Sequence, residues 1–361
     1  MHCSKILLIR LRQIGDVVFT TPAIRCLRQM FPGAHLTYVV EPAAAPIVAL
    51  NPHLNEVIVA PPASRLRQLP GDIALGLQLK AASYDLAIDF HGGPRSSLLA
   101  WLSRAPVRLG YEIAGRSWMY TTRVARPREL RRRHSVENQW DLLLALGAPR
   151  PDPEAFPVEM PVDPAVAERI GTRLAAAGVG PADRLIVIHV SAGNPFRRWP
   201  VASFVSLAAA LASRDPRRRI VITAGPSAWE LAGEVTGAAR SALGPSSSKQ
   251  VLACGDFSLD ELRALFDRAV LFIGGDSGPL HVAATSHVPV VGLYGPTLPV
   301  RSAPWRAACW TTESVDAGDL PCRPCDQRVC APGDFRCLAW IQPGAAVDAA
   351  ERALARGKIT G

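Results

Sequence analysis

Short apolar runs alternate with amphipathic stretches along the first half of the chain. The apolar runs predict strands, and stretches with an apolar residue at every third or fourth position predict helices. In chain order, strands are expected at residues 5–10, 36–40, 56–60 and 84–90, and helices at 21–30, 74–82, 96–103 and 136–146. Such alternation favours a parallel sheet that is covered by helices on both faces. Thr21 is expected to cap the first of these helices.

A proline-rich stretch then interrupts the alternation. Residues 147–157 contain four prolines and predict an extended, stiff linker. Beyond it the pattern restarts, with strands expected at 185–190, 219–223, 269–273 and 288–293. The sequence therefore predicts an α/β protein with two Rossmann-like, doubly wound domains, residues 1–160 and 161–361. The last helix packing back on the first domain is left as an option.

The loop after Ile273 has the most distinctive composition. It reads Gly274-Gly-Asp-Ser-Gly-Pro279, and proline suits the first turn of the helix that follows. A turn of this kind directs free backbone N–H groups and the positive end of a helix at one point, which suits a phosphate or pyrophosphate. A similar strand and loop occupy residues 6–16. We therefore expect two domains that face one cleft.

Ligands of open α/β sheets bind beyond the carboxyl ends of the strands, so the loops there carry the candidate chemistry. Asp16 follows the first strand, where a carboxylate is either a helix cap or a general base for an incoming hydroxyl. The segment 191–200 contains a possible cluster of backbone N–H groups and two arginines, Arg197 and Arg198. Either the arginines bind phosphate, or one of them stacks on Trp199.

Several familiar motifs are missing from the sequence. No Gly-x-Gly-x-x-Gly follows a strand, which weakens the case for a nicotinamide or flavin enzyme. The sequence has neither a Walker A loop nor an Asp-x-Asp pair that would hold a divalent cation. We therefore expect no cofactor, and we expect arginine and helix ends to neutralise a departing diphosphate.

Charge and hydropathy narrow the choice of partners. Apolar residues make up 48% of the chain, yet no run approaches the roughly 20 that a membrane helix needs. Lys5, Arg10 and Arg12 interrupt the apolar amino terminus, so no signal peptide is expected and a cytoplasmic location is predicted.

The net charge is +9. Its main local source is the cluster Arg123, Arg126, Arg128, Arg131, Arg132, Arg133 and His134. Two interpretations of this cluster stay open. It contacts phosphates, either on an anionic membrane surface or on an acidic acceptor, or it is a solvated basic loop. It lacks interleaved aromatic residues, which argues against nucleic acid as a partner.

Half of the eight cysteines lie close together near the carboxyl end. Their spacing is C-x2-C-x4-C-x6-C, formed by Cys322, Cys325, Cys330 and Cys337. The segment is either a zinc site or a structured loop with four reduced thiols.

Taken in order, several motifs resemble those of glycosyltransferase family 9, the ADP-heptose:lipopolysaccharide heptosyltransferases. The resemblance rests on residues 6–25, Tyr84-Asp-Leu-Ala-Ile-Asp89, Arg108-Leu-Gly-Tyr111, Arg197-Arg-Trp-Pro200, Gly274–His281 and Val291-Gly-Leu-Tyr-Gly-Pro296. The cysteine segment is similar to that of the second-heptose branch, heptosyltransferase II.

The resemblance implies a GT-B fold and metal-independent transfer with inversion at the anomeric carbon. The first domain would bind an anionic lipopolysaccharide or glycolipid acceptor at the inner membrane surface, and the second an ADP-sugar. Asp16 occupies the position of the family's catalytic base. Arg197 stands where the family commonly has a lysine that contacts the diphosphate. The other positions that the resemblance implies are Ser191, Glu230, Asp276, Ser277, Gly278 and His281 for the donor and Arg95 for the acceptor.

Three alternatives stay open at this point. A family member could use another nucleotide sugar or a different acceptor, since donor choice depends on few side chains. The chain could be a non-catalytic nucleotide-sugar-binding protein, although the presence of Asp16 argues against this. A GT-B-fold epimerase would turn over a nucleotide sugar with no acceptor present.

Overall fold

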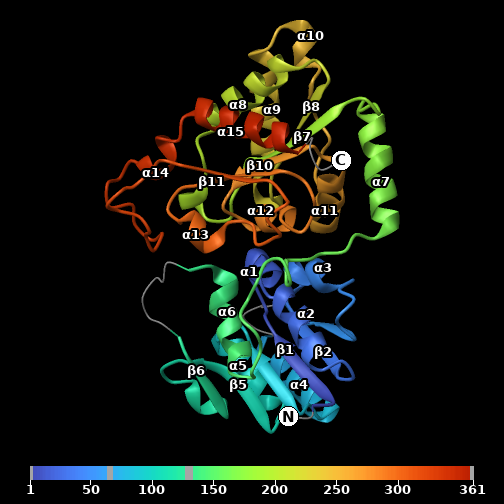
Figure 1. Ribbon diagram of the computed structural model, residues 1–361, viewed down its shortest axis with the longest axis vertical. Helices are drawn as coiled ribbons and strands as arrows, with labels where there is room; N and C mark the ends of the chain where they lie inside the picture. Colours follow the sequence, from blue (N-terminus) through green and yellow to red (C-terminus); the bar gives the residue numbers. More distant parts are fainter. Residues whose placement is uncertain (1–2, 63–67, 127–132, 358–361) are drawn as a thin grey trace. The chain divides into compact units, whose positions relative to one another are not determined.

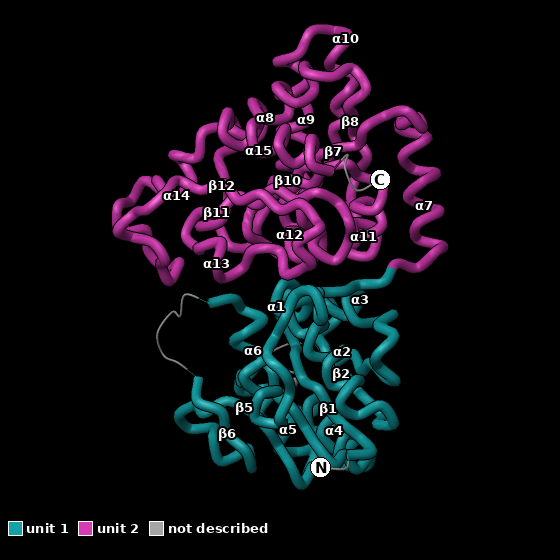
Figure 2. Tube along the Cα trace, viewed as in Figure 1, with its two compact units in different colours: residues 1–161 teal, residues 162–361 magenta. Residues whose placement is uncertain are grey.

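A computed structural model of the chain describes residues 3–62, 68–126 and 133–357. The chain divides into two compact units, residues 1–161 and 162–361 (Figure 2). The division lies one residue from the boundary that the proline-rich linker predicts.

Unit 1 contains a six-stranded sheet among its described residues, in the order β3-β2-β1-β4-β5-β6 (Figure 1). All neighbouring strands are parallel. The strands are β1 Lys5–Ile9, β2 His35–Val40, β3 Glu56–Val59, β4 Leu86–Asp89, β5 Val107–Glu112 and β6 Thr122–Ala125. The main helices are α1 Ile14–Val18, α2 Thr21–Met30, α3 Ala45–Val48, α4 Gln68–Ala82, α5 Pro94–Leu102 and α6 Ser135–Leu144.

Unit 2 repeats this plan over its described residues, with the order β12-β11-β10-β7-β8-β9 and parallel pairing throughout. Its strands are β7 Arg184–His189, β8 Arg218–Thr223, β9 Val251–Leu252, β10 Leu271–Gly275, β11 Val290–Tyr294 and β12 Thr312–Asp316. Its main helices are α7 Pro164–Ala176, α8 Val201–Arg214, α9 Trp229–Ser241, α11 Leu259–Arg268, α12 Gly278–Ala283 and α15 Pro343–Arg356.

Helices cover both faces of the unit 2 sheet, which explains why its central strands are predominantly apolar. The helices α8, α9 and α15 pack together, and α7, α11 and α12 form a second group (Figure 1). Residues 271–275 of β10 and 290–294 of β11 are buried on both sides. The last helix, α15, packs on β10, β11, β12 and α8, so these contacts lie within its own unit.

The strand order gives each unit a topological switch point. This is the place between two adjacent strands from which the following connections run toward opposite edges of the sheet. In unit 1 it lies between β1 and β4, and in unit 2 between β7 and β10. Open α/β sheets bind their ligands outside the carboxyl ends of the strands at this point. The loops after these four strands are therefore the places to look for a site.

Two local predictions differ from the structure. The residue that caps α2 is Thr20, not Thr21, and its side chain makes no capping hydrogen bond. Instead the hydroxyls of Thr20 and Thr21 donate to the carbonyls of Val17 and Val18 at 2.7 and 2.8 Å, which ties α2 to α1. The strands β5, β6, β9 and β12 were not predicted. In β6 three of the four residues are exposed and the strand lies in the arginine cluster, and β9 is only two residues long.

Candidate active site

Asp16 lies in the first turn of α1, directly beyond the end of β1. The residue that caps this helix is Gln13, so the alternative that Asp16 serves as the cap is wrong. The Asp16 carboxylate is instead ion-paired with the guanidinium of Arg10, and its side chain is 38% exposed. A carboxylate that is fixed by a cation and still reaches solvent can accept a proton from a bound hydroxyl.

Arg10 fixes this carboxylate from the interior of unit 1. It follows β1, is 7% exposed, and donates through Nη1 to the carbonyl oxygen of Phe90 at 2.7 Å. It therefore joins the ends of β1 and β4 at the switch point while its Nη2 group donates to Asp16. The sequence pattern around Arg10 did not predict a function for it. One signal in the sequence could have identified Arg10, because it directly follows four consecutive apolar strand residues. A charged residue that is buried at such a position usually has a partner.

His91 follows β4 and lies among the same charged groups. Burial, followed by the positive charges of Arg10 and Arg12, lowers the pKa of His91 to about 4. Arg126 also contributes to this shift, and its guanidinium lies 5.0 Å from the centre of the Tyr111 ring. At neutral pH His91 is therefore an uncharged side chain beside several arginines. This environment suits an anionic group on a ligand.

Asp89, the last residue of β4, holds the turn that carries His91. Its carboxylate accepts hydrogen bonds from the N–H groups of His91 and Gly92 at 2.8 and 3.0 Å. The hydroxyls of Ser96 and Tyr120 donate to it at 2.9 and 2.6 Å. Asp89 is fully buried, and this burial raises its pKa above the ordinary value. Because its carboxylate is occupied by four donors, Asp89 has a structural role and holds the turn that carries His91.

Arg95 was predicted as an acceptor contact, but the structure gives it another role. Its Nε donates to Asp72 at 2.8 Å, Nη1 donates to Glu41 at 3.0 Å, and Nη2 donates to the carbonyl of Pro61 at 2.6 Å. All three nitrogens are thus held by the protein, and the side chain is only 10% exposed. Arg95 joins α5 to α4 and to the loops after β2 and β3, so we do not include it in the proposed site.

In unit 2, Asp276 follows β10 at the switch point and is 2% exposed. Burial opposes its ionisation, but the hydrogen bond and charge of His281, the charge of Arg197 and a hydrogen bond from Thr297 together lower its pKa to about 2. The ion-pair distances are 3.3 Å to Arg197 Nη1 and 3.4 Å to His281 Nε2. Asp276 is therefore an ionised centre that orients its neighbours, and a direct contact with the sugar stays a prediction.

Arg197 ends a short 3-10 turn, Pro195–Arg197, in the loop after β7. Its Nη1 donates to the carbonyl of Asp276 at 3.0 Å. Gly275 lies close to the backbone of Arg197, since a Cβ there would lie 3.1 Å from the Arg197 carbonyl oxygen. The second arginine, Arg198, donates to the carbonyl of Ala192 at 2.9 Å. Among the residues that the structure describes, no arginine lies over the Trp199 ring, so the stacking alternative is not observed.

The hydroxyl of Ser191 is used within the protein. It accepts a hydrogen bond from the N–H of Gly225 at 2.7 Å and lies 3.1 Å from Nε2 of His189. Ser191 thus links the loops after β7 and β8, and a contact between its side chain and phosphate stays a prediction. Glu230 lies in the first turn of α9, after β8, and is exposed at the same edge of the sheet.

Ser277 and Gly278 lie where β10 turns into α12. Ser277 is the capping residue of that helix and Gly278 its first residue. His281 is in the same short helix and is 4% exposed. The structure therefore brings the predicted donor residues Ser191, Arg197, Glu230, Asp276, Ser277, Gly278 and His281 to the carboxyl edge of the unit 2 sheet.

The four clustered cysteines are free thiols. Burial, together with the thiols of Cys325, Cys322 and Cys330, raises the pKa of Cys337, so the four lie within electrostatic reach of one another. Across the described ranges, however, no group of three or more His, Cys, Asp or Glu side chains is arranged to hold a metal ion. The geometry therefore gives the zinc alternative no support.

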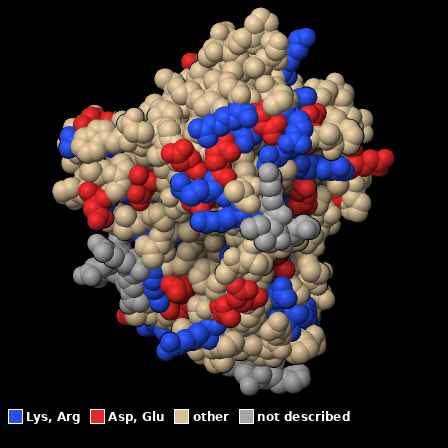
Figure 3. Space-filling model, turned by 45° about the horizontal axis from the view of Figure 1, so that its top comes forward, with Lys and Arg blue, Asp and Glu red and all other residues tan. Residues whose placement is uncertain are grey.

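The basic cluster is only partly within the described residues. Arg128, Arg131 and Arg132 lie outside them. Arg133 is ion-paired with Asp141, and His134 caps α6 by accepting from the N–H of Val136 at 3.1 Å. On the face drawn in Figure 3, Lys and Arg side chains are interspersed with Asp and Glu. No helix within the described ranges is long and apolar enough to cross a membrane.

The family model described as glycosyltransferase family 9 (heptosyltransferase) matches residues 73–333. This match covers most of the chain, including the loops after β4, β7, β8 and β10. The chain belongs to glycosyltransferase family 9. It is therefore a glycosyltransferase.

Known proteins resemble the chain over most of its length. Lipopolysaccharide heptosyltransferase 3 of Escherichia coli is 29% identical over 321 residues, which cover 87% of this chain and 89% of that protein. A family 9 glycosyltransferase structure from Veillonella parvula has a TM-score of 0.84 at 24% identity, covering 98% of this chain and 97% of the other. The structure of E. coli ADP-heptose lipopolysaccharide heptosyltransferase II has a TM-score of 0.76 at 20% identity, covering 98% and 99%.

These findings settle part of what the sequence predicts for this family 9 member. The GT-B fold is confirmed by the two parallel sheets and by the structural likeness to heptosyltransferases. The relatives named above include heptosyltransferases of types 3 and II, so the assignment to the second-heptose branch stays a prediction.

Proposed function

We propose that this family 9 member transfers heptose from ADP-heptose to the inner core of lipopolysaccharide, with inversion and without a metal ion. The observation that carries the proposal is the Arg10–Asp16 pair at the switch point of unit 1. The names of the E. coli relatives, a lipopolysaccharide heptosyltransferase and an ADP-heptose heptosyltransferase, support the choice of donor and acceptor.

In the proposed reaction, unit 1 binds the acceptor and unit 2 binds the donor. The Asp16 carboxylate takes the proton of the acceptor hydroxyl as that oxygen forms a bond to the anomeric carbon. The bond between this carbon and the diphosphate oxygen breaks, and ADP leaves with the electron pair. Attack from the face opposite to the departing ADP inverts the anomeric configuration.

Arg10 has a positioning role in this scheme. Its ion pair with Asp16 orients the carboxylate, and its hydrogen bond to Phe90 fixes the guanidinium. A buried arginine can hold this geometry because its planar guanidinium donates in two directions at once.

The departing ADP requires compensation of negative charge in unit 2. Arg197 supplies a positive charge there, and the N–H groups at the start of α12 add donors beside it. A cationic side chain at this position supports transfer that does not need a divalent cation. Peripheral attachment to the inner membrane, through the basic residues near 123–134, is part of the same proposal because the acceptor is a lipid.

The decisive experiment compares Asp16→Asn with the unchanged protein, using ADP-heptose and a heptose-free lipopolysaccharide acceptor with chelator present. We expect Asp16→Asn to lower kcat by about 10²–10⁴-fold, the usual contribution of a general base, while ADP binds with unchanged affinity. Normal turnover by Asp16→Asn would refute its role as the base.

The same assay separates the other functions. Turnover of a nucleotide sugar without acceptor would identify an epimerase, and a preference for UDP over ADP in calorimetric titration would identify a different donor. Loss of activity in chelator would refute metal independence, and the anomeric coupling constant of the product tests inversion.

A further inference from the structure

The segment between the clustered cysteines contacts the proposed donor site. Gln327, between Cys325 and Cys330, accepts a hydrogen bond through Oε1 from Arg197 Nε at 2.7 Å. The same oxygen accepts from Asn194 Nδ2 at 3.0 Å. These residues are 130 or more positions apart in the chain, so the contact is purely tertiary.

The contact fixes one edge of the Arg197 guanidinium while Asp276 fixes another. Nε is held by Gln327, and Nη1 is held by the carbonyl and carboxylate of Asp276 at 3.0 and 3.3 Å. Among the described residues, no hydrogen bond or ion pair involves Nη2, and the side chain is 30% exposed. Nη2 is therefore the part of the guanidinium that remains for a ligand.

Other contacts hold this segment in place. Phe335 packs on Phe196 with ring centres 5.2 Å apart, and Arg323 donates to the carbonyl of Thr297 at 2.9 Å. Thr297 in turn donates to Asp276. Gln327 itself adopts a left-handed backbone with φ of 60°, which a residue with a side chain rarely takes without compensating contacts. The segment is thus built to present the Gln327 amide to Arg197.

We infer that Gln327 is a positioning residue that orients Arg197 toward the diphosphate of the donor, an inference that rests on the proposed function. The pairing depends on arginine at position 197. A lysine, which the family commonly has there, carries only a terminal ammonium and offers no Nε–H to the glutamine. Gln327 therefore helps determine how this chain holds a nucleoside diphosphate through Arg197.

The test is a double-mutant cycle in the full-length protein, with ADP binding measured by calorimetry and donor KM by kinetics. Gln327→Met keeps the length of the side chain but removes the accepting oxygen. We expect it to weaken ADP binding and raise the donor KM by about tenfold, because a guanidinium that is not fixed in advance must be ordered when the ligand binds. The acceptor KM should not change.

In the Arg197→Lys background, adding Gln327→Met should change ADP affinity by less than twofold, because the Nε–H is already gone. Arg328→Ala is the matched control, since this neighbour is 85% exposed and is ion-paired only at 3.9 Å with Asp326. It should bind ADP as the unchanged protein does.

The outcomes distinguish this inference from the proposed function. If Arg197→Ala binds ADP normally, the donor assignment of Arg197 itself fails. If Arg197→Ala binds weakly but Gln327→Met binds normally, the positioning role is overturned. It is also overturned if Gln327→Met weakens binding equally in both backgrounds. Should Gln327→Met lower the Tm, Gln327→Gly replaces it in the cycle, because glycine lacks the accepting oxygen and suits the left-handed backbone there. Equal effects of that change in both backgrounds would again overturn the role.

Discussion

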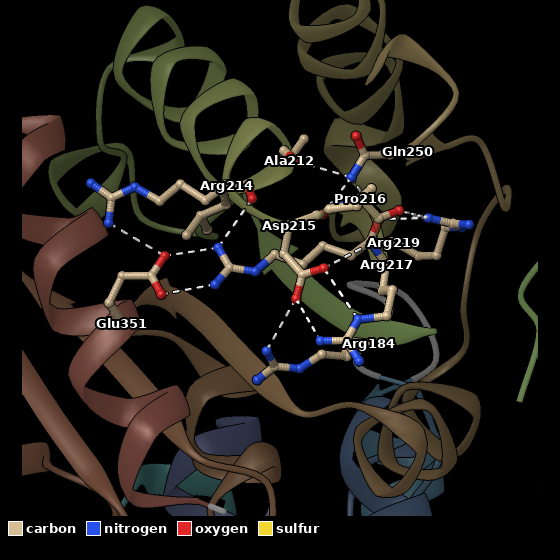
Figure 4. A network of polar contacts seen from close by, with 11 residues as sticks. Arg184, Ala212, Arg214, Asp215, Pro216, Arg217, Arg219, Gln250 and Glu351 are labelled. Carbon is tan, nitrogen blue, oxygen red and sulfur yellow. Dashed lines mark hydrogen bonds and ion pairs between the residues drawn. The ribbon is translucent and has the colours of Figure 1, made fainter. Parts of the chain in front are cut away.

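Arg218 and Glu351 form a two-pronged ion pair, in which Nη1 and Nη2 each donate to one carboxylate oxygen at 2.8 Å. Arg218 begins β8 and is 4% exposed, while Glu351 lies in α15. The pair fastens the last helix to the amino end of the unit 2 sheet, within a wider network that includes Arg184, Arg214 and Asp215 (Figure 4). This edge is opposite the loops of the proposed donor site.

We expect Glu351→Gln to destabilise the protein at pH 7 without changing ADP affinity. The hydrogen bond from Arg218 lowers the pKa of Glu351 below its ordinary value. A carboxyl with a lowered pKa stabilises the fold above its unfolded pKa, and this contribution is lost as the pH falls through the folded pKa. Leaving the buried Arg218 with a weaker partner should cost about 1–3 kcal/mol at pH 7.

The measurement is urea unfolding of both proteins between pH 3 and 7. The difference in unfolding free energy should be largest at neutral pH and shrink below about pH 4.5, near the ordinary pKa of a glutamic acid. A difference that grows on acidification would contradict this account.

Replacing Arg10 by lysine should separate positioning from donor binding. Lysine keeps the positive charge but cannot donate to both Phe90 and Asp16 with the geometry of a guanidinium. We expect kcat to fall by about tenfold or more while ADP affinity stays unchanged, since Arg10 belongs to unit 1. Steady-state kinetics with calorimetric titration of ADP checks this, and a change in ADP affinity alone would disprove it.

Gly275→Ala should weaken donor binding by displacing a loop. The added Cβ would lie 3.1 Å from the carbonyl oxygen of Arg197, which is backbone and cannot rotate away. The matched control is Gly193→Ala in the loop that carries Arg197, where an added Cβ would meet no atom within 4 Å. We expect about three- to tenfold weaker ADP binding for Gly275→Ala, equivalent to about 1 kcal/mol, and little change for Gly193→Ala. Equal affinity of the two variants would show that the close approach is not required.

His91 should stay neutral over the whole physiological pH range. Burial, with Arg10 and Arg12 next in importance, places its pKa near 4 instead of the ordinary value near 6.5. Between these values the unfolded chain binds a proton that the folded protein does not, so stability falls as the pH is lowered from 6.5 to 4.

NMR titration of the histidine ring protons checks the assignment, with His91→Gln identifying the signal. We expect no shift of this signal above about pH 5. The His91→Gln variant should also lose up to about 1.4 kcal/mol per pH unit of the acid sensitivity between pH 4 and 6.5. A midpoint near pH 6.5 would mean that His91 is open to water and not surrounded by arginines.

The sequence predicted the central elements of this fold well, because their patterns are local. Strands β1, β4, β7 and β10 are apolar runs that end at glycine, histidine or polar residues, and buried parallel strands require such runs. The edge strands β6 and β12 are mostly exposed or half-buried and carry polar residues, so their composition resembles that of loops. Their strand structure depends on pairing with β5 and β11.

The sequence by itself determined the family, the two-unit plan and the loops that carry Asp16, Arg197 and Asp276. These features depend on residue type and on short spacings, which a linear pattern preserves. Only the tertiary structure showed that Arg10 holds Asp16, that Arg95 is enclosed by other residues, and that Gln327 reaches Arg197. The physical reason is that the role of a charged side chain depends on its partners and burial, which are set by residues far away in the sequence.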